Sequence, residues 1–228
     1  MTPPTRTRVG LHPRAVFEVL LALVLAGCAT APQPTPIERA IAASAHQGNP
    51  VAQLDLGVRI LARAHTARDR TTAVMWIRRA ADANLAIAQD RLGSLYLNGI
   101  EVPQDTATAI EWLQRAAKRG APAAQLKLGQ LYAVGAVLPV DEAKAYYWYS
   151  VAAKPTHSDL TIFNIDQVRA YASIRARALA ASLTAAERAS VDQQVAAWTT
   201  VASVPYSTAV MLNNYYVRVS PKQVSNER

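Results

Sequence analysis

The sequence predicts an all-α protein built as an α-solenoid, which is a stack of antiparallel helix pairs. Three segments align when the chain is compared with itself at a shift of 36 residues, and the same residue types recur in each segment. Each segment also holds two stretches with helical spacing, separated by turn residues. Repeats of this length form arrays in which each unit buries its apolar face against its neighbours.

The most informative aligned positions are one glycine and one tryptophan in each copy: Gly57, Gly93, Gly129, Trp76, Trp112 and Trp148. Each glycine lies inside the first helix of its unit, where glycine costs about 1 kcal/mol relative to alanine. Its return at one register indicates that a neighbouring helix passes too close for a side chain. The tryptophans, each followed by a pair of alanines, are expected to fill the contact between units.

Turn and capping residues predict where the helices begin and end. The first helix should end at Asn98-Gly99 in the second copy and at Gly135 in the third, because glycine suits the left-handed position after a helix. The second helix should begin near Asp105 or Asp141, as an N-cap or a first-turn acid. In the first copy Arg63 replaces the turn glycine, so an irregular turn is expected there.

The repeat register divides most of the chain. After an N-terminal tether we expect a half-repeat at 37–49 and three repeats at 50–85, 86–121 and 122–157. A capping helix pair at 158–202 and a partly disordered tail at 203–228 should follow. The two capping helices should span about 162–182 and 185–200, and a capping box runs from Thr184 to Glu187. Such caps close the exposed ends of a solenoid.

The first 27 residues have the layout of a secretory signal. A leader with three arginines is followed by an apolar run over residues 15–26, interrupted by Glu18. The run is too short for a membrane-spanning helix, which needs about 20 apolar residues. It ends in Leu25-Ala26-Gly27-Cys28, and Cys28 is the only cysteine of the chain. A disulfide within the chain is therefore excluded.

The four residues that end this run closely resemble the lipobox of bacterial lipoproteins. The resemblance implies that residues 1–27 are removed and that Cys28 becomes a lipidated first residue, which anchors the chain durably through several acyl chains. The alternating prolines of residues 28–36 favour an extended tether. Ala29 after the cysteine resembles lipoproteins sent to the outer membrane. We therefore expect a cell-envelope lipoprotein, at the outer membrane and facing the periplasm.

The repeat itself resembles a known family. Its second copy reads Ala88-x-x-x-Leu92-Gly93-x-x-Tyr96, followed by an aspartate, a tryptophan and an alanine pair. This pattern is similar to the Sel1-like repeat family, whose fold is related to that of tetratricopeptide repeats. The tetratricopeptide period of 34 residues would slip by four residues over two steps, and no slip occurs. The resemblance implies a right-handed superhelix and a scaffold or adaptor role in envelope assemblies.

No catalytic constellation is present in the sequence. The four histidines are isolated from one another, and no metal-binding, nucleophile or phosphate-loop motif occurs. We therefore predict no catalytic, cofactor or metal site, and no enzyme. The aromatic run Tyr146–Tyr149 could stack on a sugar, but register places Trp148 in the core and leaves one or two of the three tyrosines exposed.

The first helices of such arrays usually form the concave face. We predict that six residues of these helices form part of a protein-binding groove. Asp55, Arg91 and Lys127 lie two positions before the repeat glycines, and Arg59, Leu95 and Leu131 lie four residues after these three residues. The alternative is that these residues simply face solvent. The expected partner is one or more envelope proteins.

Charge supports a second hypothesis, a protein that binds peptidoglycan or an anionic polysaccharide. The net charge is +8, and removal of residues 1–27 takes away three arginines and one glutamate, which leaves +6. The alternative explanation of this charge is a mildly basic surface that simply faces solvent. Nucleic acid is not an expected partner, because the basic residues form no dense stripe and the leader directs the chain out of the cytoplasm.

Overall fold

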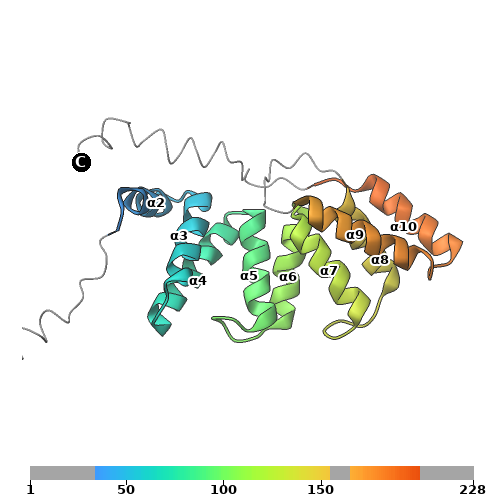
Figure 1. Ribbon diagram of the computed structural model, residues 1–228, viewed down its shortest axis with the longest axis horizontal. Helices are drawn as coiled ribbons and strands as arrows, with labels where there is room; N and C mark the ends of the chain where they lie inside the picture. Colours follow the sequence, from blue (N-terminus) through green and yellow to red (C-terminus); the bar gives the residue numbers. More distant parts are fainter. Residues whose placement is uncertain (1–33, 155–164, 201–228) are drawn as a thin grey trace, which may run out of the picture. The chain divides into compact units, whose positions relative to one another are not determined.

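The computed structural model describes residues 34–154 and 165–200. The chain divides into two units, Met1–Thr35 and Pro36–Arg228, and every helix described belongs to the second. Nine helices and no strand occur in the described residues (Figure 1), so the predicted all-α class is confirmed. The helices are α2 Pro36–His46, α3 Pro50–Ala62, α4 Ala67–Asp82, α5 Ala86–Asn98, α6 Thr106–Lys118, α7 Pro122–Val134, α8 Glu142–Ala153, α9 Ile165–Ala180 and α10 Ala185–Ala197.

Three helix pairs, α3–α4, α5–α6 and α7–α8, follow one another as an α-solenoid. The two helices of a pair pack on each other, and the second helix of each pair packs on the first helix of the next. Figure 1 shows the loops within the pairs at one edge of the array and the turns between pairs at the opposite edge. We call the first of these the loop edge.

The predicted helix ends of the second and third pairs are confirmed. Gly99 follows α5 with φ of 65° and Gly135 follows α7 with φ of 73°, the left-handed region that glycine adopts without strain. Asp105 and Asp141 cap α6 and α8 by accepting a hydrogen bond from a backbone amide in the first turn. Bonds from the backbone amide and the hydroxyl of Thr108 lower the pKa of Asp105.

The first pair differs at its loop, as its sequence predicts. Arg63 ends α3 with φ of −113° instead of a left-handed glycine. Thr66 then begins α4 in a reciprocal capping box with Asp69. Asp69 thus shares the register of Asp105 and Asp141 but lies three residues inside its helix.

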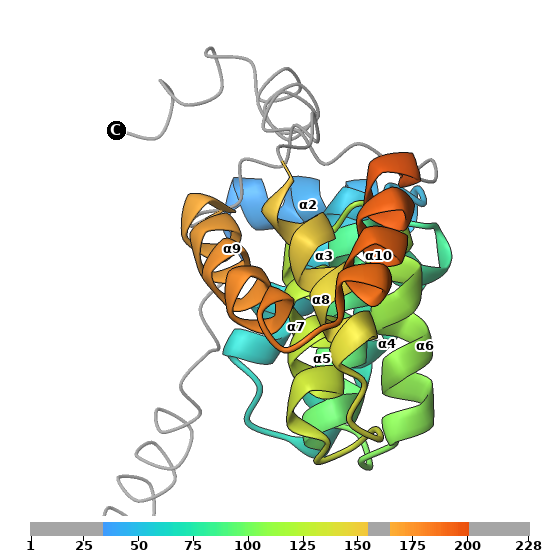
Figure 2. The same cartoon turned by 90° about the vertical axis from the view of Figure 1, so that its right-hand side faces the viewer.

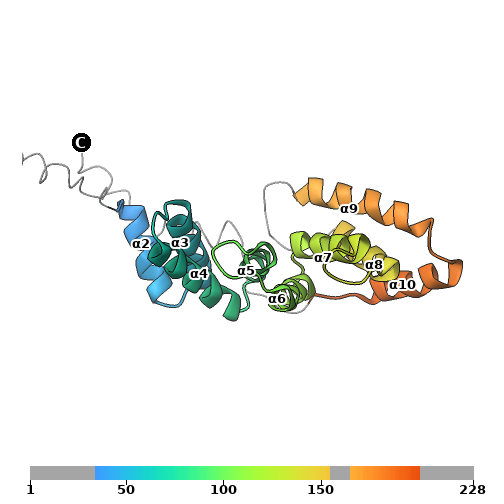
Figure 3. The same ribbon diagram turned by 90° about the horizontal axis from the view of Figure 1, so that it is seen from below.

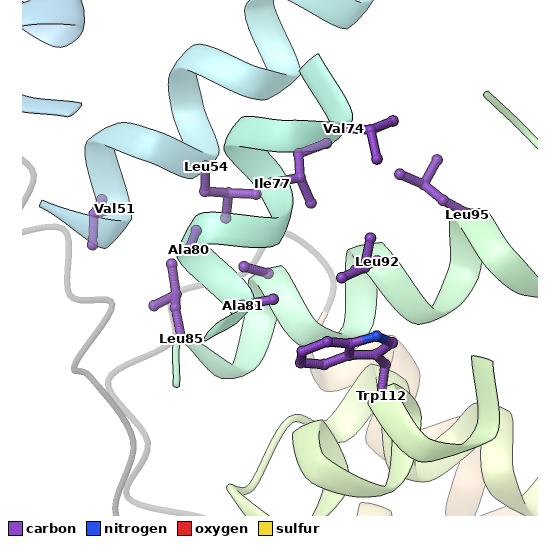
Figure 4. Packing of buried hydrophobic residues seen from close by; sticks show 11 residues of the cluster. Val51, Leu54, Val74, Ile77, Ala80, Ala81, Leu85, Leu92, Leu95 and Trp112 are labelled. Atoms are coloured by element: carbon purple, nitrogen blue, oxygen red, sulfur yellow. The ribbon is translucent and has the colours of Figure 1, made fainter. Parts of the chain in front are cut away.

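The core is continuous from one pair to the next. Figure 4 shows side chains of α3, α4, α5 and α6 meeting in one cluster, with the indole of Trp112 beneath Leu92. Trp112 is 7% exposed and Leu92 is fully buried. Because this cluster crosses the boundary between the first and second pairs, neither pair buries its apolar face alone.

The repeat glycines lie where two helices approach closely. A Cβ atom at Gly57 would lie 2.8 Å from the main-chain oxygen of Ala73, and one at Gly93 would lie 2.9 Å from Cγ of Leu113. At Gly129 the corresponding neighbour is the ring of Tyr149, at 2.8 Å. These separations leave no room for a side chain, which accounts for glycine at all three positions.

A buried glutamine joins each pair to the helix before it. The three side-chain amides, 36 residues apart, each donate from Nε2 to a backbone carbonyl: Gln53 to Ala45 at 3.2 Å, Gln89 to Ala81 at 3.0 Å, and Gln125 to Ala117 at 2.9 Å. The acceptors lie in the last turn of the preceding helix, where carbonyls lack a partner within the helix. The recurring Ala-Gln pair in the sequence is the trace of this contact.

Helices α9 and α10 lie on either side of α8 and close the C-terminal end of the array (Figures 2 and 3). The Tyr146 hydroxyl donates to Asp192 at 2.7 Å, and the predicted capping box of Thr184 and Glu187 is present. Both helices end slightly earlier than the sequence predicts, α9 at Ala180 and α10 at Ala197, and residues 162–164 lie outside the described part of the chain. At the other end, α2 packs on α3 as the expected capping helix.

Two expectations for the aromatic run of α8 are wrong. Trp148 is only half-buried, whereas Tyr149 is 1% exposed and Tyr146 is also buried. Tyr147 is half-buried, so none of the three tyrosines is freely exposed. The reason is that α7, α9 and α10 together cover α8 on several sides. The run therefore presents no fully exposed aromatic side chain.

The expected lipidation site Cys28, the tether up to Gln33 and the predicted tail at 203–228 lie outside the described residues. Among the helices that are described, none combines the length and the hydropathy that crossing a membrane would require.

Candidate functional site

The predicted groove residues lie on the first helices of the three pairs. We call Asp55, Arg91 and Lys127, on α3, α5 and α7, the charged column. Arg91 is exposed, and Asp55 and Lys127 are partly exposed. The column therefore reaches solvent in all three repeats, as expected, but each member has a different local environment.

In the first repeat the column residue is neutralised within its own helix. Arg59 Nε lies 3.0 Å from Asp55 Oδ1, one turn further along α3. Exposed pairs of this kind contribute only about 0.3–0.5 kcal/mol. The pair presents both charges to solvent without a strong net field.

In the third repeat the column residue ties two repeats together. Lys127 Nζ lies 2.7 Å from Oδ1 and 2.9 Å from Oδ2 of Asp90, and it also donates to the Ser94 hydroxyl at 2.8 Å. Asp90 and Ser94 belong to α5, so the ammonium group joins α7 to the first helix of the preceding pair. Asp90 and Ser94 could not be found from the repeat register, because the other repeats have apolar or different residues at those positions.

Arg91 has no equivalent partner. The positions on α3 that match Asp90 and Ser94 are Leu54 and Val58, which offer no acceptor. Arg91 makes no ion pair or hydrogen bond with any residue that the structure describes. It is the charged group of the column that remains available to a molecule outside the chain.

Two leucines predicted in the groove belong to the core instead. Leu95 is 4% exposed and packs in the cluster that contains Trp112, and Leu131 is partly buried against the next cluster. A step of four residues rotates the side chain by about 40° around a helix. Leu95 and Leu131, four residues after Arg91 and Lys127, are therefore turned away from solvent and toward the contact between helices. Of the six predicted groove residues, the charged candidates at the surface are Asp55, Arg59, Arg91 and Lys127.

The described residues offer no site for metal chemistry. No group of three or more His, Cys, Asp or Glu side chains there could hold a metal ion. His46 packs edge-on against Trp76, with ring centroids 4.9 Å apart, which is a packing contact.

Comparison with known proteins assigns the repeats. The model of the Sel1 repeat matches residues 50–85, 86–120 and 122–154. These matches fall on the three helix pairs α3–α4, α5–α6 and α7–α8. No curated protein matches the chain significantly.

Two solved structures are similar to this chain. A protective antigen of uropathogenic Escherichia coli strains with an SLR fold is 24% identical, with a TM-score of 0.55 over 82% of this chain. This chain spans 35% of the length of that antigen. A Sel1 repeat protein from Oxalobacter formigenes is 31% identical, with coverage of 60% of this chain and 94% of that one and a TM-score of 0.49.

The period of 36 residues, the glycines at close helix contacts and the three matched repeats agree with one another. The helical stack is also the fold of the matching Escherichia coli antigen. The three helix pairs of the chain are therefore Sel1 repeats.

Proposed function

We propose that this protein is a lipid-anchored adaptor of the bacterial cell envelope that binds protein partners through the charged column. The Sel1 family points to a protein–protein interaction scaffold. The observation that carries the proposal for this face is Arg91, an exposed guanidinium without a partner among the described residues. Repeat proteins of this kind are generally scaffolds without enzymatic activity, and the proposal includes no catalytic step.

The anchor in this proposal is Cys28. Its support is the sequence: a basic leader, a short apolar run and Leu25-Ala26-Gly27 directly before the cysteine. The tether that follows would hold the array near the membrane on the periplasmic side of the outer membrane. An anchored adaptor meets its partners at a high effective concentration, so modest affinities suffice for binding.

Replacement of Cys28 by serine is expected to abolish lipidation, because serine offers no thiol for a thioether. The measurement is metabolic labelling with palmitate, together with fractionation of membranes and soluble protein. We expect no label in the Cys28→Ser protein and its release from the membrane fraction or retention of the leader. Labelling equal to that of the wild type would refute the anchor.

Reversal of charge at Arg91 is expected to weaken partner binding by about tenfold or more, since a buried charge contact that becomes repulsive costs at least 1–2 kcal/mol. The measurement is recovery of envelope proteins with the detergent-solubilised wild type and with Arg91→Glu. Arg177→Glu makes the same change on the exposed surface of α9 and serves as the control. Equal loss in both variants would show a general charge effect and contradict the role of the charged column.

The alternative function, binding of peptidoglycan or an anionic polysaccharide, is favoured by the net charge of +6 that remains after removal of residues 1–27, which hold three arginines and one glutamate of the full chain's +8. Binding of a polyanion by distributed charge weakens steeply with salt. Recovery of polymer alone, lost at modest salt, would replace the adaptor proposal with this one. Recovery of a protein that survives the same salt would support the adaptor.

A further inference from the structure

The edge of the array opposite the loop edge, where the turns between pairs lie, is rich in basic residues, and we call it the turn edge (Figure 1). The last five residues of α4 and of α6, with the residue after each helix, contain one acidic residue, Asp82, and five basic ones: Arg78, Arg79, Arg115, Lys118 and Arg119. The loop edge, at residues 63–70, 99–105 and 135–144, contains five acidic and four basic residues. The formal charge is therefore +4 at the turn edge and −1 at the loop edge.

The basic residues of the turn edge are not neutralised by carboxylates. None of the five makes an ion pair within the described residues, whereas three of the four at the loop edge do. The guanidinium of Arg79 lies 4.8 Å from the ring centroid of Trp76 instead. One repeat later, that of Arg115 lies 4.7 Å from the ring centroid of Trp112. A ring holds a guanidinium in place but carries no net charge. Residues 201–228 contain three basic residues and one acidic residue, so they supply no excess of negative charge either.

The fold does not require these cations. A basic residue in the last turn stabilises a helix by offsetting its dipole, yet α5, α7 and α8 have none there. The first turns of α3, α5 and α7, which begin at the turn edge, have no acidic residue. Leu85 and Ala121, the N-caps of α5 and α7, provide no side-chain hydrogen bond, so the positive ends of two helix dipoles add to the charge of this edge.

The tether brings one anionic surface within reach of the turn edge. Eight residues, 28–35, lead from the lipidation site to Pro36 at the start of α2, and at about 3.1 Å per residue they span about 25 Å. Helices of 13 residues, such as α5 and α6, are about 20 Å long. Either edge can therefore meet the bilayer, and the tether alone does not choose between them. Attraction to anionic head groups favours the basic edge.

We propose that the turn edge lies against the membrane and binds the phosphates of anionic phospholipid head groups. The inference rests on the lipid anchor of the proposed function and adds the orientation of the array on the bilayer. Stacking on a ring occupies one face of a guanidinium and leaves its N–H groups for a phosphate. A soluble polyanion has the same charge as the bilayer but no tether that raises its effective concentration. Arg91, in the middle of α5, is left open to a protein partner.

The test uses the full chain, purified with its lipid from bacterial membranes and reconstituted into phosphatidylcholine vesicles with or without phosphatidylglycerol. A thioether at Cys28 leaves no free thiol, so Ala83→Cys at the turn edge or Ile100→Cys at the loop edge can be labelled with a fluorophore. Quenching by lipids that carry a nitroxide on the head group then reports which edge lies at the membrane.

Two double variants test the role of the charge. Arg115→Gln with Lys118→Gln removes two charges from the turn edge. Arg177→Gln with Arg188→Gln removes the same charge from exposed positions on α9 and α10 and is the matched control. High salt and vesicles without phosphatidylglycerol remove the attraction without any change of the protein.

With phosphatidylglycerol at low salt, we expect the label at position 83 to be quenched about threefold or more strongly than the label at position 100. The difference should vanish without phosphatidylglycerol and in about 1 M NaCl, where the Debye length falls to about 3 Å. The turn-edge variant should reduce the difference about twofold or more, and the control variant should leave it unchanged.

Equal quenching at both positions, in a protein that floats with the vesicles, would overturn the inference and leave the anchor intact. A preference that persists without phosphatidylglycerol, or that both double variants reduce equally, would overturn it as well. If soluble polygalacturonate changes the fluorescence at position 83 while lipid does not quench it, the edge belongs to an anionic polysaccharide instead. A chain that does not float with the vesicles would contradict the anchor and this inference together.

Discussion

Gly93→Leu is expected to destabilise the array by roughly 1–3 kcal/mol or more, because the new side chain must enter a closely packed contact between α5 and α6. A Cβ atom alone would lie 2.9 Å from Cγ of Leu113 and 3.1 Å from the main-chain oxygen of Ala109. The first neighbour can rotate, but the second belongs to the backbone of a packed helix. The leucine must therefore push the two helices apart and open the contact between Leu92 and Trp112.

Thermal unfolding followed by circular dichroism measures this effect. The control is Arg91→Leu, which introduces the same side chain at an exposed position two residues earlier on the same helix. Surface changes of this kind usually stay within about 0.5 kcal/mol. A melting temperature of Gly93→Leu equal to that of the control would show that the helices do not need this close approach.

Trp112→Ala is expected to cost about 3–5 kcal/mol, the range for truncation of a buried large aromatic side chain. Trp112 is 7% exposed and belongs to the cluster shared by the first two pairs. The guanidinium of Arg115 lies over its ring at 4.7 Å and would lose a cation–π contact as well. Truncation therefore separates two repeats rather than leaving a local void.

Trp148→Ala is the matched comparison, because this residue has the same register but is only half-buried. Its truncation should cost clearly less than that of Trp112. Urea unfolding followed by circular dichroism measures both free energies, and a lower m-value for Trp112→Ala would indicate that the repeats no longer unfold together. A larger cost at Trp148 than at Trp112 would contradict the packing described above.

Local features that recur between repeats could be predicted from the sequence. These features are local requirements, and each is met by one residue type. They are a glycine where a Cβ atom would lie less than 3 Å from a neighbouring helix, a left-handed residue after a helix, and an aspartate at a helix start. Because they return every 36 residues, the register alone places them. The capping box at Thr184 is equally local, so it too was predictable outside the repeats.

Features that depend on what packs beside a repeat could not be predicted in this way. Trp148 shares the register of Trp112, yet α9 and α10 add neighbours that favour burial of Tyr146 and Tyr149 instead. Lys127 shares the register of Arg91, yet only Lys127 faces a carboxylate on the preceding first helix. These differences depend on neighbours that have no counterpart in the other repeats.

The three glutamine contacts have a consequence for how such a chain can evolve. The capping helix α2 offers the Ala45 carbonyl to Gln53 in the same way that α4 offers Ala81 to Gln89. Each junction therefore has the same donor on one side and the same acceptor on the other. Tandem duplication of one 36-residue unit would create a junction already supplied with both groups, so the gene can lengthen or shorten the array without inventing a new contact.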